Sequence, residues 1–364
     1  MNIISSVYIE LTGNCNQRCP YCYNHMLVNS GGELDADRVT ALLLEAVEYG
    51  ISNIHFSGGE PFLYYELEKV ILAAYDAGLG VCVISNGKCF EKDNLALLLR
   101  LQPDLQITFD GHNAETHDLT RGLGNFEQII SGILNAKKSG YHGAVTARIN
   151  LHRGNIGQVS KILNMLEGKF DVDGEDNRDI ENISVAAIRR TEDSGIEFTE
   201  YLKADEYLSY PEMIEMFDNW NGRHRAQIKH DFSVPDMGCA FNAENGSIQC
   251  GLRIALNGNV FPCQMFTIDK FAIGNIYDNT LVDIMNGTAL ENFSDMMRER
   301  LGKIPQCSGC GFKFICAGGC PAEAYIENGT LFSVSSKCTA RKRYMADAFV
   351  MAAKNHSRST MSHS

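Results

Sequence analysis

The sequence predicts an α/β protein in two parts: a set of parallel strands with covering helices, followed by a smaller cysteine-rich region. Up to about residue 190, short runs rich in β-forming residues alternate with amphipathic helical segments, which is the pattern of βα units around parallel strands. Several of these runs end in loops that contain glycine. Eight of the thirteen cysteines lie beyond residue 238, which sets the second region apart.

Six candidate strands and the helical segments between them make up the first region. The segment at residues 35–49 has apolar side chains at helical spacing and stops at Gly50, and similar helices are predicted at 63–77 and 126–138. Reactive groups in parallel α/β folds gather at the carboxyl ends of the strands, so the loops there are the candidate sites. The predicted strands are residues 7–11, 51–56, 81–85, 105–109, 145–150 and 183–188.

Composition narrows the classes of function. The chain has 364 residues, 45% of them hydrophobic, and a formal net charge of −13, which argues against nucleic acid or an anionic membrane as a partner. No run approaches the roughly 18 apolar residues of a membrane span, and no secretory signal is recognisable, so a cytoplasmic location is expected. In a reducing compartment, thirteen cysteines indicate metal binding, and their odd number leaves disulfide pairing incomplete.

Three cysteines follow the first predicted strand within a single loop. Cys15, Cys19 and Cys22 are separated by three and then two residues. Three thiolates leave one iron of a [4Fe–4S] cluster without a protein ligand, and a small molecule can bind at that open iron. The alternatives are buried thiols or a zinc site, for which His25 is available as a fourth ligand.

This loop, with Tyr21 directly before its third cysteine, resembles the signature of the radical S-adenosylmethionine (SAM) enzymes. The resemblance implies a partial (β/α)6 barrel with a [4Fe–4S] cluster on Cys15, Cys19 and Cys22. It also implies that the amino and carboxylate groups of SAM bind the open iron. An electron from the cluster then cleaves SAM into methionine and a 5′-deoxyadenosyl radical.

Motifs after the second and third predicted strands are similar to the SAM-binding motifs of this family. Gly58-Gly59-Glu60-Pro61 resembles the motif that holds the SAM amino group. Glycines permit a close backbone approach and a carboxylate accepts hydrogen bonds from an ammonium group, while a plain strand-to-helix turn is the alternative. Ser85-Asn86-Gly87 is similar to the Thr-Asn-Gly that often follows the third strand in the family.

The fourth and fifth predicted strands add three candidate SAM-binding residues. The resemblance implies that Thr108 and Asp110 lie near the SAM carboxylate or ribose, and a simple turn is the alternative. Arg148 can bind the SAM carboxylate bidentately, and a solvated arginine is the alternative. The run that resembles the Ser-x-Asp-Gly…His-Asp…Arg-Gly sequence of the peptide-modifying branch comprises Thr108, Asp110, Gly111, His117, Asp118, Arg121 and Gly122.

Four cysteines of the second region are separated by two, five and three residues: Cys307, Cys310, Cys316 and Cys320. A further cysteine, Cys338, follows them. This pattern resembles the SPASM extension of radical SAM enzymes, with a zinc ribbon as the alternative. The resemblance implies two auxiliary [4Fe–4S] clusters, and thus three clusters in all. Auxiliary cluster I is assigned to Cys239, Cys250, Cys263 and Cys320. Auxiliary cluster II is assigned to Cys307, Cys310, Cys316 and Cys338.

The assignment leaves one question open among the ligands of auxiliary cluster I and leaves two cysteines of the first region without a cluster. Cys239 and Cys250 depart from the usual spacing before Gly258, which leaves open whether both are ligands or auxiliary cluster I has only three. Cys82 is interpreted as a small apolar residue in a strand and Cys89 as an incidental loop thiol.

The chain divides into four predicted segments: a radical SAM barrel at 1–190, a bridging segment at 191–237, a SPASM domain at 238–354 and a disordered polar tail at 355–364. Asn257-Gly258 predicts a tight hairpin turn between strands at 254–256 and 260–261. Helices are predicted at residues 281–285, 290–300 and 340–354.

The resemblance implies net oxidation of a substrate. In the sulfatase-maturing branch, an aspartate directly after the cysteine equivalent to Cys263 acts as a base, whereas this chain has Gln264, which cannot. We therefore expect a maturase of ribosomally made peptides that forms a carbon–carbon or carbon–sulfur cross-link or makes a related change. Anaerobic sulfatase maturation, a small-molecule dehydrogenase and a non-enzymatic iron–sulfur electron carrier are the alternatives.

The expected partners follow from this interpretation. They are a peptide substrate and an electron donor such as flavodoxin or ferredoxin, with neither nucleic acid nor a membrane. Only six residues precede the first predicted strand, so we expect a separate protein to recognise any leader peptide. The full cysteine set favours a peptide over a small molecule, and the motif at residues 58–61 is one that a mere electron carrier would not need.

Overall fold

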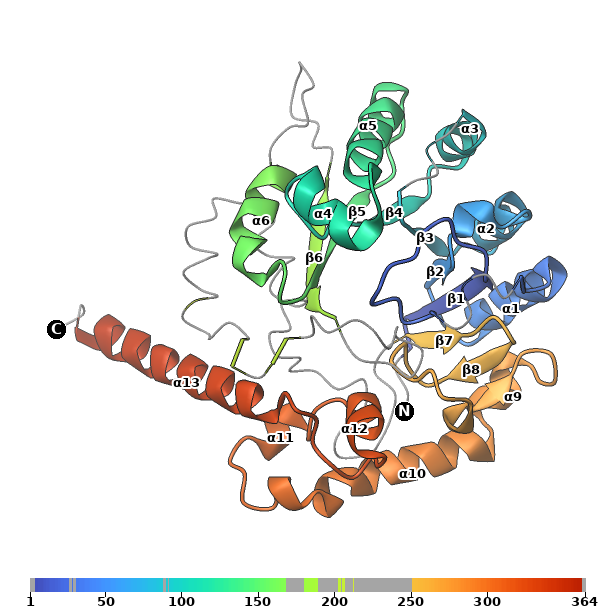
Figure 1. The fold of residues 1–364 in the computed structure, drawn as a ribbon. Coiled ribbons are helices and arrows are strands. Elements are labelled where there is room, and N and C mark those ends of the chain that lie inside the picture. Colours follow the sequence, from blue (N-terminus) through green and yellow to red (C-terminus); the bar gives the residue numbers. More distant parts are fainter. Residues whose placement is uncertain are drawn as a thin grey trace.

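A computed structural model shows how these segments are arranged (Figure 1). It describes residues 4–25, 28, 31–87, 90, 92–167, 180–188, 202–203, 205–206, 212 and 251–361. Most of the predicted bridging segment lies outside these residues, as do Cys89, Cys239 and Cys250.

One open sheet of nine strands runs through the described part of the chain, in the order β6-β5-β4-β3-β2-β1-β7-β8-β9. The first six strands in the chain are parallel and each pairs with its neighbour in sequence. The sheet does not close, which confirms the predicted partial barrel. These strands are β1 Ser6–Thr12, β2 Asn53–Gly58, β3 Gly80–Ser85, β4 Asp104–Thr108, β5 Val145–Leu151 and β6 Asn182–Ala187.

Six helices accompany these strands, and the prediction gave bounds only for α1, α2 and α5. Helix α2 starts later than expected, because Pro61–Leu63 form a short 3-10 helix that the Glu60 side chain caps. Helix α4 was not predicted; the motif run after β4 is helical, and the Asn113 side chain caps it by accepting from the Thr116 N–H (3.1 Å). The helices are α1 Ala36–Glu48, α2 Leu67–Asp76, α3 Lys92–Leu101, α4 Ala114–Arg121, α5 Asn125–Lys138 and α6 Val159–Glu167.

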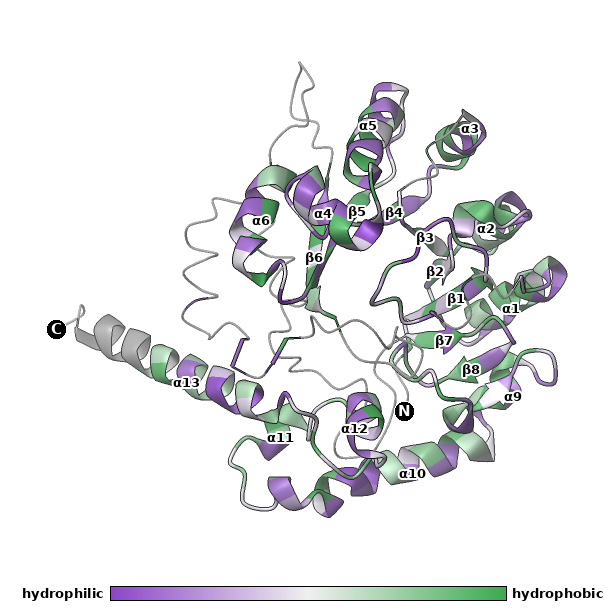
Figure 2. Cartoon of the chain, in the orientation of Figure 1, coloured by the Kyte–Doolittle hydropathy of each residue, from purple (hydrophilic) through white to green (hydrophobic). Residues whose placement is uncertain are grey.

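The two faces of the parallel sheet differ in polarity. Side chains on the outer face, such as Ile9, Phe56 and Val83, are apolar and fully buried. Figure 2 shows the strands as largely hydrophobic, and helices α1 and α2 with polar residues on their outer sides. On the inner face, register pairs join polar residues: Tyr8 lies beside His55 on β2, and Arg148 beside Ser184 on β6.

The second region continues the same sheet. Strand β7, Leu252–Ile254, pairs in parallel with β1, and β8, Asn259–Phe261, returns antiparallel to it. Gly258 has φ +84°, so the hairpin turn predicted at Asn257-Gly258 is confirmed. The sequence did not show that this hairpin pairs with β1, the strand that leads into the cysteine loop. The sheet ends with β9, Gly274–Asn275.

Five helices complete the described chain, and the last of them projects from the rest of the molecule (Figure 1). Helix α13 extends to Met361 and so includes most of the stretch from residue 355 for which a disordered tail is predicted. Among the described residues, none of the helices is both long enough and apolar enough to span a membrane. The helices are α9 Leu281–Met285, α10 Thr288–Lys303, α11 Lys313–Cys316, α12 Pro321–Asn328 and α13 Cys338–Met361.

Candidate functional site

The loop after β1 brings three thiols together. Cys15, Cys19 and Cys22 are all partly buried, and the Cys22 N–H donates to the Cys19 carbonyl (3.1 Å). Burial raises the pKa of each thiol, and repulsion from Cys19 contributes to the increase at the other two, so the pKa of Cys22 reaches about 12. Thiolates at this site need a nearby positive charge, and the iron ions of a bound iron–sulfur cluster supply it. The donor set therefore fits the predicted cluster.

Two glycines allow the end of β2 to lie directly against the backbone of this loop. Gly58 has φ +122°, and a Cβ at this position would lie 2.6 Å from the Thr12 carbonyl oxygen. A Cβ on Gly59 would collide with the Asn14 carbonyl. The Gly59 N–H donates to the Thr12 carbonyl (2.7 Å) and the Glu60 N–H to the Asn14 carbonyl (2.8 Å). These glycines therefore position the backbone that leads to the cysteines.

The Glu60 carboxylate lies fully buried between the ends of β2 and β3. It accepts from the Ser85 hydroxyl (2.9 Å) and from the Asn86 backbone N–H (2.8 Å). Burial raises the pKa of Glu60 to about 7, although these hydrogen bonds oppose the increase. The Asn86 amide donates to Asn16 (2.8 Å) and lies 3.9 Å from the Cys15 sulfur. Glu60, Ser85 and Asn86 thus form one assembly beside the cysteine loop.

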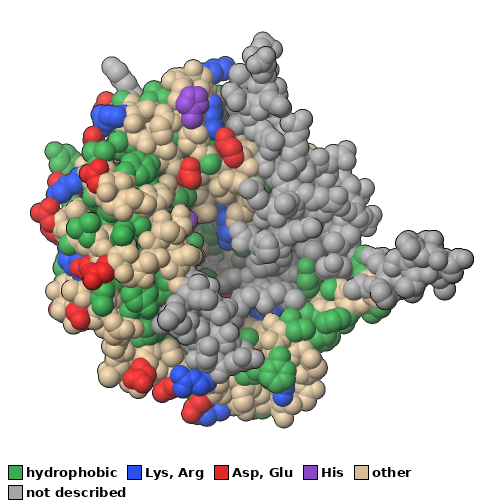
Figure 3. Space-filling view, turned by 180° about the vertical axis from the view of Figure 1, so that it is seen from behind, with side chains coloured by type: hydrophobic (Ala, Val, Ile, Leu, Met, Phe, Trp, Pro, Cys, Tyr) green, Lys and Arg blue, Asp and Glu red, His purple; other side chains and the backbone are tan. Residues whose placement is uncertain are grey.

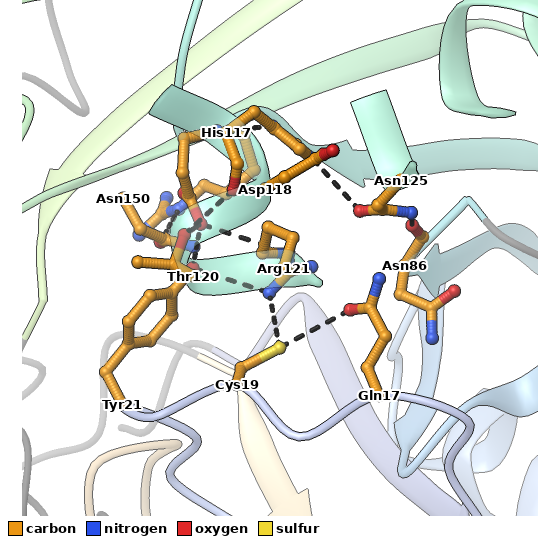
Figure 4. A network of polar contacts seen from close by, with 12 residues as sticks. Gln17, Cys19, Tyr21, Asn86, His117, Asp118, Thr120, Arg121, Asn125 and Asn150 are labelled. Carbon is orange, nitrogen blue, oxygen red and sulfur yellow. Dashed lines mark hydrogen bonds and ion pairs between the residues drawn. The ribbon is translucent and has the colours of Figure 1, made fainter. Parts of the chain in front are cut away.

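A buried polar network centres on Asp110, which follows β4 (Figure 4). The carboxylate of Asp110 accepts from the hydroxyls of Tyr21 and Thr120, the second at 3.0 Å. Nε of Arg121 lies 3.9 Å from it, and Nη1 of Arg121 donates to the Cys19 sulfur (3.2 Å). Asp110 is therefore joined to the cysteine loop through both Tyr21 and Arg121, which goes beyond a simple turn.

His117 holds helices α4 and α5 against the end of β4. Its Nδ1 accepts from the Asp110 backbone N–H (3.1 Å), and its Nε2 lies 3.0 Å from Oδ1 of Asn125. Burial lowers the pKa of His117, so the neutral ring carries its proton on Nε2 and donates to Asn125. The Asn125 amide reaches the Asn86 carbonyl (3.5 Å). The contributions of Thr120 and Asn125 were missed because the sequence did not predict α4.

Thr108 and Arg148 lie side by side on the inner face of the sheet. The Arg148 guanidinium donates to the Ser184 hydroxyl (2.7 Å) and to Oδ1 of Asn150 (3.3 Å), so it is anchored by protein groups rather than solvated. The sequence did not single out Ser184 or Asn150. Alternation along β5 and β6 places them on the same face as Arg148, but the pairing of these strands had to be known first.

A buried ion pair connects the cysteine loop to the second region. Arg253 on β7 donates to both carboxylate oxygens of Glu10 on β1, at 2.8 and 3.1 Å. The two side chains are only 3% and 2% exposed. Asn24, two residues beyond Cys22, donates to Glu10 (2.9 Å) and accepts from Arg253 (3.2 Å). Sequence reasoning missed this pair because the residues are far apart in the chain and meet only through the β1–β7 pairing.

The four cysteines assigned to auxiliary cluster II line one small cavity. Burial raises the pKa of the Cys307 thiol, and repulsion from the other three thiols adds to the increase. In the described part of the chain, no three His, Cys, Asp or Glu side chains converge on a point that could hold a single metal ion. Four thiols around one cavity match the four thiolate ligands of a [4Fe–4S] cluster, so the donor set fits the predicted cluster. These cysteines are Cys307, Cys310, Cys316 and Cys338.

A sharp reversal separates Cys316 from Cys320. Residues 317, 318 and 319 have φ angles of +50°, +75° and +74°, which is the left-handed region. Arg300 holds this loop by donating to the carbonyls of all three residues (2.9–3.2 Å). Cys320 is buried and is not among the described residues that line the cavity. Cys263 is also buried, and the remaining assigned ligands of auxiliary cluster I lie outside the described residues.

Charged side chains are mixed on the face of the molecule that Figure 3 shows. In Figure 3, acidic and basic side chains are interspersed over the described part of that face, with no broad region of one sign.

Comparison with known proteins identifies the class. Residues 9–166 match the Radical SAM superfamily, and residues 247–311 match SPASM, an iron–sulfur cluster-binding domain. The chain therefore carries a radical SAM domain followed by a SPASM domain, and iron–sulfur clusters and SAM are its cofactors.

Among its relatives are enzymes with different activities. The chain is 26% identical over 355 residues to the AdoMet-dependent heme synthase of Methanosarcina barkeri, which covers 91% of this chain and 95% of the relative. It is 23% identical over 348 residues to the PqqA peptide cyclase of Granulibacter bethesdensis, with 90% and 85% covered.

Solved structures show the same fold. The structure of anSMEcpe with bound AdoMet has a TM-score of 0.73 at 19% identity and covers 96% of this chain and 98% of its own. Streptococcus suis SuiB bound to the precursor peptide SuiA has a TM-score of 0.69 at 16% identity, with 93% and 76% covered. At these identities the likeness establishes the arrangement of the chain.

Proposed function

We propose that this protein oxidises a ribosomally made peptide, forming a carbon–carbon or carbon–sulfur cross-link or making a related oxidative change. The observation that carries the proposal is the second cysteine site. SAM cleavage needs only the three-cysteine loop, whereas the chain also builds a cavity lined by four cysteines. A further cluster allows an electron to be removed from a substrate radical, which makes net oxidation possible.

Cys15, Cys19 and Cys22 are proposed to hold the SAM cluster, the first of three [4Fe–4S] clusters. When bound, the cluster and SAM supply a 5′-deoxyadenosyl radical that removes a hydrogen atom from the substrate. Tyr21 and Asp110 set the position of the loop around Cys19 through their hydrogen bond. This buried network fixes the ligands before the cofactors bind and so reduces the cost of ordering them.

The proposed SAM site lies where the ends of β2, β3 and β4 approach the loop. Gly58, Gly59 and Pro61 set the backbone, and the Glu60 carboxylate retains lone pairs that can accept from the SAM ammonium group. Ser85 and Asn86 hold that carboxylate in place. Thr108 and Arg148 are proposed to meet the SAM carboxylate or ribose from the inner face of the sheet.

The SPASM cysteines are proposed to hold two auxiliary clusters. Cys307, Cys310, Cys316 and Cys338 would bind auxiliary cluster II, since they line one cavity. Auxiliary cluster I is assigned to Cys239, Cys250, Cys263 and Cys320. Of these, Cys320 directly follows the reversal at residues 317–319 and does not line that cavity. An electron donor such as flavodoxin or ferredoxin would reduce the SAM cluster, and a separate protein would present the leader peptide.

Relatives support a peptide substrate and also supply the main alternative. PqqA peptide cyclase is named for a peptide, and the SuiB structure contains its precursor peptide. The heme synthase, which matches this chain over a similar length, favours a small-molecule substrate as the second candidate. Sulfatase maturation is less favoured because the position after Cys263 is Gln264, an exposed residue that cannot act as a base.

Anaerobic co-expression with candidate precursor peptides tests the proposal, with peptide mass as the readout. We expect one peptide to lose two hydrogens, about 2 Da, and fragment ions to locate the new bond. The C15A/C19A/C22A variant is the control and should leave the mass unchanged. Deuterium uptake from heavy water without this loss would indicate epimerisation and contradict the proposal.

Two further outcomes separate the alternatives. Formation of 5′-deoxyadenosine with no change in any peptide would favour a small-molecule substrate. Absence of 5′-deoxyadenosine after anaerobic reduction with SAM would favour an iron–sulfur electron carrier.

A further inference from the structure

Arg341 is a buried cation at the cavity of the second cysteine site. It lies on α13, three residues beyond Cys338, and is only 1% exposed. Its Nη2 donates to the Ser335 hydroxyl (3.1 Å). Nε and Nη1 are buried and have no hydrogen-bond partner among the described residues. The side chain lines the same cavity as the four cysteines.

The other buried arginines of the described chain are compensated by the protein itself. Arg253 forms a bidentate pair with Glu10, and Arg121 lies beside Asp110. Arg300 donates to five backbone carbonyls. Arg341 has no such set of acceptors in the described part of the molecule, although a guanidinium stays charged in proteins and is costly to bury without partners. An anionic group in the cavity would supply them.

Gly319 fixes the position of this guanidinium. A Cβ on Gly319 would collide with the guanidinium of Arg341, and its φ of +74° already favours glycine. The planar group thus packs directly on the backbone of the loop that follows Cys316. The local structure therefore accommodates Arg341 at the edge of the cavity instead of leaving it to reach solvent.

We infer that Arg341 donates hydrogen bonds from Nε and Nη1 to sulfur atoms of auxiliary cluster II and thereby raises the reduction potential of that cluster. The inference rests on the cluster assignment of the proposed function but not on the identity of the substrate. A [4Fe–4S] cluster with four thiolate ligands is anionic, and reduction makes it more so. Hydrogen bonds to sulfur and a nearby positive charge stabilise the reduced form more than the oxidised form. Arg341 is thus a positioning and tuning residue, not a catalytic one.

The test compares R341M and R341K with R343M, in which an exposed arginine on the same helix is replaced. All three are made in the C15A/C19A/C22A background, so that only auxiliary clusters contribute, and are titrated potentiometrically with electron paramagnetic resonance detection. We expect R341M to keep its iron but to lower the midpoint potential of one cluster, R341K to lower it less, and R343M to leave it unchanged. Equal potentials in R341M and the parent, at equal iron content, would overturn the inference.

A second measurement separates this role from a purely structural one. Without clusters, R341M should be at least as stable to urea as the parent, because it removes a buried cation that has a single described acceptor. With clusters bound, R341M should be less stable than the parent. Equal destabilisation in both states would show that Arg341 acts only in folding.

The assignment of the cluster itself is checked with C338A. This variant should lose the iron and the signal of one auxiliary cluster. Retention of both would show that Cys338 is not a ligand, a failure that is distinct from an unchanged potential in R341M and from the absence of a modified peptide.

Discussion

The two cysteine sites compensate their buried charges in different ways. At the N-terminal loop, Arg121 lies beside Asp110, whose carboxylate also accepts from two hydroxyl groups. At the cavity lined by Cys307 and its partners, Arg341 has a single described acceptor, Ser335. The buried arginine of the first site is therefore paired with a protein carboxylate, whereas the buried arginine of the second site needs a bound anion.

This difference follows from how each site is built. The N-terminal cysteines lie within one short loop at the ends of parallel strands, where polar groups from β2, β3 and β4 converge. The cysteines of the second cavity are spread over residues 307–338: Cys307 and Cys316 end short helices, Cys310 lies between them, and Cys338 begins α13. We therefore expect the first site to be largely formed before its cofactors bind, and the second to gain more of its stability from its cluster.

The largest effect is expected from removing the N-terminal ligands. In C15A/C19A/C22A, SAM cleavage should fall below detection, because no cluster remains to deliver an electron. About two thirds of the iron should persist, since two of three clusters have separate ligands. Iron analysis and the assay for 5′-deoxyadenosine check both statements. Loss of all iron would show that the second site cannot load without the first.

The next largest effect is expected from R253M, which breaks the ion pair between the two regions. Glu10 would be left as a buried, uncompensated carboxylate, which typically costs about 3–5 kcal/mol. Urea unfolding followed by circular dichroism should show this loss of stability. The double variant E10Q/R253M should recover part of it, because no buried charge then remains unpaired.

An exposed ion pair provides the matched control for R253M. Glu299 and Lys303 are four residues apart on α10, with more than half of each side chain exposed. E299Q should leave the unfolding midpoint unchanged, because water screens this pair. A loss in E299Q comparable to that in R253M would mean that burial is not what makes the pair of Glu10 important.

A smaller, pH-dependent effect is expected from Glu60. Burial raises the pKa of Glu60 from 4.5 to about 7, so the folded protein binds a proton more readily than the unfolded chain between these values. Stability should therefore fall as the pH rises from about 4.5 to about 7, by at most about 3 kcal/mol. Burial lowers the pKa of His55 to about 4, which gives a slope of the opposite sign.

The variant E60Q separates the two contributions to the pH dependence. Apoprotein carrying E60Q should lose the falling component and retain the rising component from His55. Unfolding midpoints measured at several pH values for the parent and E60Q give the difference directly. Parallel pH profiles of the two proteins would show that Glu60 stays ionised in the folded state.

Sequence patterns among neighbouring residues predicted several main features of the fold and of the cysteine loop. The six parallel strands, the loop of three cysteines and the turn at Gly258 each depend on a few neighbouring residues, and the structure confirms them. Helix α4 was missed because its polar sequence has only a weak apolar pattern, and its order depends on the Asn113 cap and on contacts of Thr120 and His117.

Long-range pairing could not be predicted in the same way. The contact between Glu10 and Arg253 exists only because β7 pairs with β1, and nothing in either segment specifies the other. Arg341 also gave no signal, since a basic residue on a polar helix is ordinarily exposed. Its significance depends on the loop at residues 317–319, whose backbone leaves room for it.

The smallest effect, and the closest test of the contrast between the sites, is expected from single hydroxyl groups. S335A removes the one described acceptor of Arg341, which should cost about 1 kcal/mol in the apoprotein. T120V removes one of the donors to Asp110 and should cost a similar amount. Loading the clusters should reduce the cost of S335A, because sulfur then offers Arg341 other acceptors, and leave that of T120V unchanged. Equal responses of the two variants to cluster loading, measured by urea unfolding, would mean that both sites are neutralised in the same way.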